Sequence, residues 1–355
     1  MSRQTQVIIH ADAILNNFKL LANLSPQSRS IAVIKADAYG HGAVNVARIL
    51  KYVSPRFTVA IIEEAIALRE AGITAPVIVL EGAHQPKECA LAHANNCILV
   101  MHNRQQLNWM LACEPEQRPH IWLKVDSGMH RLGFSLKELT AVVDEYRELL
   151  SKETVLATHL ACADEQDNAL TAQQIRDFRQ LASAMELPVS IANSPATIIW
   201  PGSRGDWNRL GIGVYGGQPE PGQLALAPTM SLRSSIIALR QVPKGESVGY
   251  GQHWVAQKDS QIATVGIGYA DGYPRHCPNG TPVAVNGAIA PLAGRVSMDM
   301  ITVDVTHLPH VNIGDRVELW GEQVPISKVA EAAGSIDYEL MTRVSARVPR
   351  IVKYR

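Results

Sequence analysis

Between residues 8 and 225, short apolar runs alternate with longer segments whose apolar residues recur every three or four positions. Eight such runs are nearly continuous in apolar residues, which is typical of parallel strands buried on both faces. Eight repeats favour a closed (β/α)8 barrel of TIM type over an open Rossmann sheet, which would also carry GxGxxG after an early strand. The predicted strands are residues 31–35, 57–61, 76–80, 97–101, 120–125, 155–160, 189–193 and 210–214.

The pattern changes near residue 225. Residues 218–222, Gln-Pro-Glu-Pro-Gly, resemble a linker, and the downstream segments alternate apolar and polar residues between turn dipeptides such as Asn286-Gly287. We therefore expect a barrel domain over residues 8–225 and a mostly β C-terminal domain over residues 226–355. Residues 1–7 are expected to add a strand to the second domain.

Composition limits the partners of the chain. Its 33 basic and 33 acidic residues cancel, so no global charge attracts nucleic acid or an anionic membrane. No apolar run has the length of a membrane span, and the N-terminus lacks the apolar core of a signal peptide. The five cysteines form no CxxC pair, which indicates reduced thiols in a cytoplasmic protein and no metal site.

Lys35 stands where the first apolar run meets a loop of small residues and glycines. At the carboxyl end of a barrel strand, such a lysine is held rigidly beside a pocket. Partial desolvation favours its neutral amine, the form that attacks an aldehyde to make a Schiff base. A lysine that merely ends a strand is the alternative, but the neighbouring Tyr39, Gly40 and Gly42 favour a catalytic role.

Other polar residues also stand at the carboxyl ends of predicted strands, which share one rim of a barrel. Each in isolation fits a helix cap or an ion pair, and Ser194 is expected to cap the helix that follows it. Together they favour a pocket. The set comprises Lys124 and Arg131 from the fifth strand, His159 and Asp164 from the sixth, Ser194 from the seventh and Arg209 from the last.

A phosphate group needs oriented N–H donors and small residues that let the backbone approach. Barrels often hold a phosphate near their last two strands. Ser194, the amides of Gly211 and Ile212, and the hydroxyl of Tyr39 are therefore the candidate phosphate-binding groups. Gly211 taken alone is better explained as an ordinary turn glycine.

The motifs, taken in order, resemble those of the alanine racemase family over essentially the whole chain. They are the Lys35 motif, Lys124 with Arg131-Leu132-Gly133, Thr158-His159, Arg209-Leu210-Gly211-Ile212-Gly213, Gly249-Tyr250-Gly251, residues 266–272, residues 294–299 and Tyr338-Glu339. The resemblance implies pyridoxal 5′-phosphate (PLP) as cofactor and alanine as substrate. It also implies a homodimer whose active sites are shared between the subunits.

The same resemblance implies roles for individual residues. Racemisation of L- and D-alanine would use two bases on a PLP external aldimine, with Lys35 on one face and Tyr250 of the partner subunit on the other. Lys124 matches a position that is often carbamylated, and its charge would orient Arg131. The implied cofactor contacts are Lys35, Tyr39, Arg131, His159, Ser194, Arg209, Gly211, Ile212 and Tyr338. The implied substrate contacts are Arg131 and Met298, and the implied access corridor is Asp164, Tyr269, Arg275, Arg295 and Ile336.

Several other functions fit parts of these patterns. A racemase of broader specificity, acting on serine or basic amino acids, is one alternative, but the expected cytoplasmic location and the tyrosines of the corridor favour alanine. A barrel-type amino-acid decarboxylase has a similar architecture, whereas a PLP carrier protein resembles only the first half of the chain. A sugar-binding barrel would bind no PLP. The product, D-alanine, would serve peptidoglycan synthesis or, in the reverse direction, be catabolised.

Overall fold

The structure is a computed structural model that describes residues 3–217 and 224–354. The chain forms two compact units: residues 14–227 form one, and residues up to Ala13 combine with those from Pro228 onward to form the other. The predicted linker at 218–222 lies outside the described residues. Among the helices that the structure describes, none is long and apolar enough to cross a membrane.

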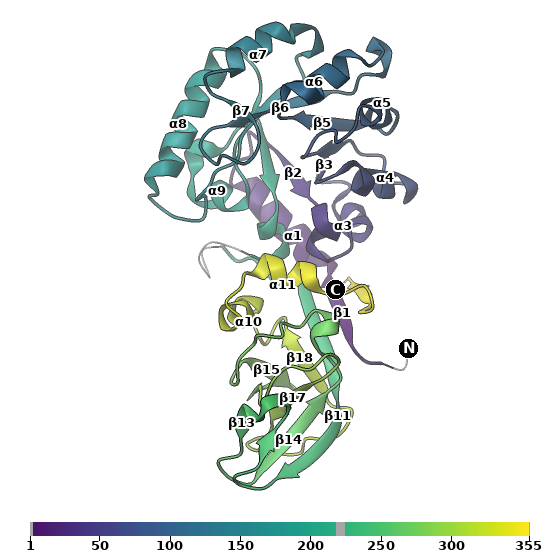
Figure 1. Cartoon of the computed structure of the whole chain (residues 1–355), viewed down its shortest axis with the longest axis vertical. Coiled ribbons are helices and arrows are strands. Elements are labelled where there is room, and N and C mark those ends of the chain that lie inside the picture. Colours follow the sequence, from purple (N-terminus) through teal and green to yellow (C-terminus); the bar gives the residue numbers. More distant parts are fainter. Residues whose placement is uncertain (1–2, 218–223, 355) are drawn as a thin grey trace. The chain divides into compact units, whose positions relative to one another are not determined.

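Residues 14–227 form a nearly closed barrel of eight parallel strands, which confirms the predicted fold class. Helices surround these strands in Figure 1. The backbone amide of Arg209 donates a hydrogen bond of 2.9 Å to the carbonyl of Ala192, which links the last strand to the segment after its predecessor. In barrel order the strands are β10 (Trp207–Leu210), β2 (Arg29–Val33), β3 (Phe57–Val59), β4 (Val77–Val79), β5 (Cys97–Met101), β6 (Ile121–Asp126), β8 (Val155–Ala157) and β9 (Val189–Ser190).

The barrel strands are short, from two residues in β9 to six in β6, and apolar side chains from several of them pack together. Ile31, Ile98, Trp122 and Trp207 belong to the buried core cluster of this unit. Asn168 caps α8 by accepting a hydrogen bond from the Thr171 amide. The helices of this unit are α1 (Ala11–Asn23, which begins in the other unit), α2 (Lys35–Tyr39), α3 (Ala43–Leu50), α4 (Ile62–Glu70), α5 (Lys87–Ala94), α6 (Arg104–Leu111), α7 (Leu139–Glu145), α8 (Ala169–Ser183) and α9 (Ser194–Ile199); a two-residue strand, β7 (Phe134–Ser135), pairs with β6.

The last barrel strand lies three residues before the predicted one. The prediction of 210–214 was wrong because the buried apolar residues after Gly211 form a 3-10 turn, η4 (Ile212–Tyr215), and not a strand. A short apolar run alone does not distinguish these two structures. Gly211, with φ −109° and ψ −106°, leaves the strand conformation and ends β10 after Leu210.

The other unit is built on a bent β-sheet, as the predicted mostly β domain requires. Its longest strand, β11 (Met230–Val242), pairs with β1 and β18 along its first half and with β14 from Ile236 onward, with a register shift between Ile236 and Ala238. Asn286 and Gly287, both at positive φ, form the tight turn between β15 and β16. Its other elements are β1 (Gln6–His10), β12 (Ser247–Val248), β13 (Trp254–Val255), β14 (Ser260–Val265), β15 (Pro282–Val285), β16 (Ala288–Pro291), β17 (Ile301–Asp304), β18 (Arg316–Trp320), β19 (Arg350–Lys353), α10 (Ile326–Ala332) and α11 (Asp337–Arg343).

Candidate active site

Lys35 begins α2, two residues after β2 ends at Val33. The next four residues, from Ala36 to Tyr39, all have φ near +52°, so α2 is a left-handed turn made without glycine. L-residues pay about 1–2 kcal/mol each for this conformation. Such strain persists only where the surroundings enforce it, and it is concentrated at functional sites.

Side-chain hydrogen bonds hold this left-handed turn in place. Glu64 accepts hydrogen bonds from the amides of Ala36, at 2.6 Å, and Ala60, at 2.8 Å. Asp37 accepts one from the amide of Ala43 at 2.8 Å. These hydrogen bonds attach the backbone around Lys35 to α4 and α3. The side chain of Lys35 therefore extends from a rigid segment of backbone.

The amine of Lys35 lies among positive charges. Burial, followed by the guanidinium of Arg131, lowers the pKa of Lys35 below its ordinary value, and Arg209 acts in the same direction. Glu64 and Glu81 oppose this shift only in part. The result is a larger fraction of the neutral, nucleophilic amine.

Arg209 is buried, with 6% of its surface exposed, and both terminal nitrogens of its guanidinium donate hydrogen bonds. It donates to the carbonyl and hydroxyl of Ser190, at 2.9 and 2.7 Å, and to the carbonyl of Thr158 at 2.7 Å. Two more hydrogen bonds, each of 3.2 Å, reach the carbonyl of Ile191 and Nδ1 of His159. Burial lowers the pKa of Arg209 to about 10, so it stays charged at neutral pH.

His159 is neutral in this arrangement. Burial and the charge of Arg209, in that order, hold the pKa of His159 well below its ordinary value. Since Nδ1 accepts the hydrogen bond from Arg209, the proton of the neutral ring is assigned to Nε2. The pair thus places one fixed positive charge, and not two, at this end of the barrel.

Four predicted phosphate-binding residues converge on one cradle. Ser194 Oγ accepts a hydrogen bond of 2.8 Å from the Gly211 amide. A Cβ on Gly211 would lie 2.7 Å from the hydroxyl of Tyr39, so a larger residue there would displace this hydroxyl. The Ile212 amide, at the first position of η4, has no acceptor in the described part of the chain.

The predicted capping role of Ser194 is wrong. Asn193 caps α9, because its side chain accepts the hydrogen bond from the Ala196 amide. The Ser194 hydroxyl is turned to Gly211. Either residue type caps helices well, so composition did not decide between these neighbours.

The fifth-strand residues Lys124 and Arg131 differ in exposure, and Lys124 is half-buried. Burial, then the charge of Arg209, lowers the pKa of Lys124 to about 7. Arg131 is exposed, as is the corridor candidate Asp164. Within residues 3–217 and 224–354, the Arg131 side chain makes no hydrogen bond or ion pair.

The remaining predicted residues belong to the β unit, and most of them are exposed. Tyr250, Met298 and Ile336 expose 70%, 54% and 60% of their surface. Tyr269 and Tyr338 each expose 38%. Arg275 and Arg295 are also exposed.

Two of these exposed residues stand on loops that are bonded to each other. The Tyr269 amide donates to the carbonyl of Ser297 at 3.0 Å, and the Ala270 amide donates to the carbonyl of Met298 at 2.9 Å. Tyr269 and Met298 are thereby fixed relative to one another.

The sequence analysis did not identify several residues that hold the site residues in place through hydrogen bonds. Besides Glu64 and Ser190, Gln174 on α8 accepts from the Ala161 amide at 3.0 Å and donates to the His159 carbonyl at 3.3 Å. On a sequence these look like ordinary polar residues of a helix face or strand. Of these three residues, only Gln174 could have been noticed in the sequence, because it is a polar residue on the mostly apolar face of its helix.

Models of two protein families match this chain. Residues 9–219 match the alanine racemase N-terminal domain, and residues 229–352 match the alanine racemase C-terminal domain. The chain belongs to the alanine racemase family. Members of this family are PLP-dependent isomerases.

Curated relatives and solved structures agree with this membership. An alanine racemase of Alteromonas mediterranea is 66% identical over 100% of both chains, and one of Chromohalobacter salexigens is 47% identical over 100% of this chain and 99% of its own. The crystal structure of the biosynthetic alanine racemase from Pseudomonas aeruginosa matches with a TM-score of 0.93 at 42% identity, covering 99% of each chain. An alanine racemase from Bartonella henselae with covalently bound pyridoxal phosphate matches with a TM-score of 0.90 at 29% identity, covering 98% of this chain and 99% of that one.

Proposed function

We propose that this chain interconverts L- and D-alanine, with PLP held through Lys35. The observation that carries the proposal is the environment of Lys35: a partly desolvated amine on a strained, rigid turn in the barrel of an alanine racemase family member. When bound, PLP supplies an electron sink that makes the α-proton of an amino acid removable.

The residues of the barrel unit fit such a cofactor. The cradle of Tyr39, Ser194, Gly211 and Ile212 offers hydroxyl and amide groups, including one amide without an acceptor in the described chain, and no acidic side chain. The mutual pKa effects of Lys35, Lys124, Arg131 and Arg209 show four basic groups within electrostatic range. The two guanidinium groups of this set, Arg131 and Arg209, supply permanent positive charge that suits a phosphate dianion and a substrate carboxylate. Tyr338 of the β unit is a further proposed phosphate contact.

Arg209 and His159 are proposed to limit the reaction to proton transfer. Arg209 is proposed to face the cofactor ring nitrogen with a permanent charge that disfavours a second positive charge beside it. His159 supports the same state, because it is neutral and accepts a hydrogen bond from Arg209. A cofactor ring without this second positive charge withdraws electrons less strongly. Protonation of the cofactor, the side reaction that leads to transamination, is therefore disfavoured.

Inversion of a carbon centre requires proton removal on one face and proton delivery on the other. The neutral amine of Lys35 is suited to accept a proton on its face. A tyrosine, with an ordinary pKa of about 10, needs a cationic neighbour to act as a base near neutrality. We assign this second role to Tyr250 of the partner subunit in a homodimer. The exposed aromatic and apolar side chains of the β unit, Tyr250 and Met298 among them, support a surface that another subunit covers.

Arg131 and the Met298 amide are proposed to bind the substrate carboxylate. Lys124 is proposed to carry a carbamate whose negative charge orients Arg131. Carbamate formation requires a neutral amine, and the pKa of about 7 for Lys124 supplies one at physiological pH. Asp164, Tyr269, Arg275, Arg295 and Ile336 are proposed to line the access corridor.

Purified protein incubated with L-alanine in heavy water tests the reaction. We expect deuterium at the α-carbon together with D-alanine, whereas a decarboxylase would release carbon dioxide. Borohydride reduction followed by peptide mapping is expected to place PLP on Lys35. A label on another lysine, or none, would overturn the proposal.

The same assay with L-serine and L-lysine measures substrate range. We expect both to react much more slowly than alanine, and comparable rates would favour the broader racemase. A biosynthetic role in the cytoplasm, supplying D-alanine for peptidoglycan, predicts that loss of the protein makes growth depend on added D-alanine. Growth without D-alanine would favour the catabolic role.

A further inference from the structure

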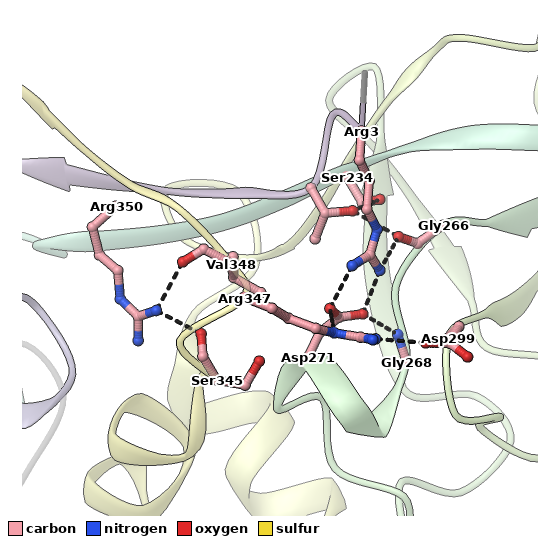
Figure 2. A network of polar contacts seen from close by, with 11 residues as sticks. Arg3, Ser234, Gly266, Gly268, Asp271, Asp299, Ser345, Arg347, Val348 and Arg350 are labelled. Carbon is pink, nitrogen blue, oxygen red and sulfur yellow. Dashed lines mark hydrogen bonds and ion pairs between the residues drawn. The ribbon is translucent and has the colours of Figure 1, made fainter. Parts of the chain in front are cut away.

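A buried carboxylate lies two residues after Tyr269. Asp271 has none of its surface exposed, and both of its oxygens accept hydrogen bonds. Arg3 binds it through two nitrogens, at 2.7 and 2.5 Å, and Arg347 binds through Nε at 2.7 Å. The Gly268 amide donates a further hydrogen bond of 3.0 Å (Figure 2). Asp271 is thus the common acceptor for two arginines and one backbone amide.

The contacts of Asp271 join four segments that are distant in sequence. Arg3 comes from the N-terminal segment, Gly268 from the Tyr269 loop and Arg347 from the C-terminal segment. Arg347 also donates to Asp299, at 2.6 Å, on the loop that carries Met298. Figure 2 shows both arginines directed at Asp271, with Arg347 reaching on to Asp299.

The Tyr269 loop has little freedom once this cluster is formed. Besides its backbone bonds to Ser297 and Met298, it approaches that loop so closely that a Cβ on Gly268 would lie 2.3 Å from the Ser297 carbonyl oxygen. Gly272, at φ +107°, ends the turn where a Cβ would lie 2.4 Å from the Arg343 carbonyl oxygen. The exposed side chains of Tyr269 and Met298 therefore stand on two loops that are linked to the buried carboxylate of Asp271.

We propose that Asp271 is a positioning residue, which sets the placement of Tyr269 and of the Met298 amide for the substrate. This inference deepens the proposed function and rests on it. A carboxylate is required because two guanidinium groups and an amide need only acceptors, whereas asparagine would turn an NH2 group toward one of them. Burial alone would raise the pKa of Asp271, but the hydrogen bonds from Arg3 and Arg347 outweigh it and the pKa is lowered, so the acceptor stays ionised.

The chain offers a matched control in Glu318. It is a carboxylate of the same unit, 5% exposed, that binds Arg233 at 3.3 Å and accepts from the amides of Gln323 and Val324. Its contacts reach neither the Tyr269 loop nor the Met298 loop. Asp271→Asn and Glu318→Gln therefore remove the same kind of charge from the same unit.

The kinetic test compares the two holoenzyme variants with L-alanine. A displacement of about 1 Å at a substrate contact can cost about 100-fold in activity. For Asp271→Asn we expect KM to rise about tenfold or more with a smaller fall in kcat, while Glu318→Gln stays within about twofold of the parent protein. Thermal denaturation of both variants shows whether their stability losses are comparable. Equal kinetics for the two variants would overturn the positioning role.

Hydrogen–deuterium exchange gives a readout that does not depend on racemisation. We expect the amides of Tyr269 and Ala270 to exchange faster in Asp271→Asn and to be unchanged in Glu318→Gln. If the parent protein does not racemise alanine, the proposed function fails, yet this exchange result still decides the structural claim. If Asp271→Asn does not fold, Arg347→Met, which keeps the two bonds from Arg3, carries the same comparison with smaller expected effects. Exchange at the parental rate in the folded variant would contradict the inference.

Discussion

The Arg209 guanidinium donates a hydrogen bond of 3.2 Å to Nδ1 of His159, and so joins a permanent cation to a ring that must stay neutral. The pKa of His159 lies well below its ordinary value, chiefly through burial and then through Arg209. Because the unfolded chain binds a proton near pH 6.5 and the folded chain does not, stability from this group is complete above about pH 6.5 and is lost as the pH falls.

We expect this pair to give a measurable acid destabilisation. Below about pH 6.5 the free energy of unfolding should fall by up to about 1.4 kcal/mol per pH unit from His159 alone. His159→Gln, which has no proton to bind, should show a shallower slope in urea unfolding across pH 5–7. Identical slopes in the two proteins would refute this account.

Lys124 is expected to carry a carbamate at neutral pH. Its pKa of about 7 leaves about half of the amine neutral and reactive toward carbon dioxide. A carbamate signal in 13C NMR with labelled bicarbonate should be present in the parent protein and in Lys137→Met, a change at an exposed lysine, and absent in Lys124→Met. Activity of Lys124→Met should fall about tenfold if its charge orients Arg131, since one charge-assisted hydrogen bond is worth about 1.5 kcal/mol or more. A signal that survives in Lys124→Met would place the modification elsewhere.

Loss of Glu64 is expected to loosen the turn that carries Lys35. Glu64→Ala leaves the amides of Ala36 and Ala60 without their acceptor, which should lower the free energy of unfolding by about 1–3 kcal/mol. The catalytic rate should fall as well, by about tenfold, because the backbone that positions the Lys35 amine is no longer rigid. The neighbouring Glu63 is exposed, so Glu63→Ala is the matched control and should change neither quantity. Urea unfolding and the alanine assay measure the two effects, and equal results for both variants would remove Glu64 from this role.

Two inactive variants are expected to complement each other if subunits share their sites. In a mixed dimer of Lys35→Ala and Tyr250→Phe chains, one of the two sites contains both Lys35 and Tyr250. Random exchange of subunits makes about half of the dimers mixed, so about a quarter of all sites should become active. Activity of the mixture, with exchange verified by native mass spectrometry, checks this. No recovery after verified exchange would mean that both residues act within one chain.

The barrel was predictable from the sequence because its strands are buried on both faces and stand out as apolar runs. The left-handed turn after Lys35 was not, because alanine, aspartate and tyrosine rarely adopt positive φ and nothing local indicates it. The cluster at Asp271 was also out of reach. Its partner Arg3 lies 268 residues away in the sequence, and no local pattern pairs residues over that separation. The roles of Tyr250 and Met298 stay predictions from the family resemblance.

The β unit is assembled from both ends of the chain, with β1 lying between β11 and β19. During synthesis, β1 leaves the ribosome some 220 residues before its first neighbour, a delay of about 10–40 s at ordinary rates of translation. During this delay the barrel, which is inserted in the sequence between β1 and β11, has time to fold. Both edges of β1 remain unpaired until β11 and β19 have been synthesised. Shielding of this one early strand, by a chaperone or by fast barrel folding, would then govern the yield of native protein in the cell.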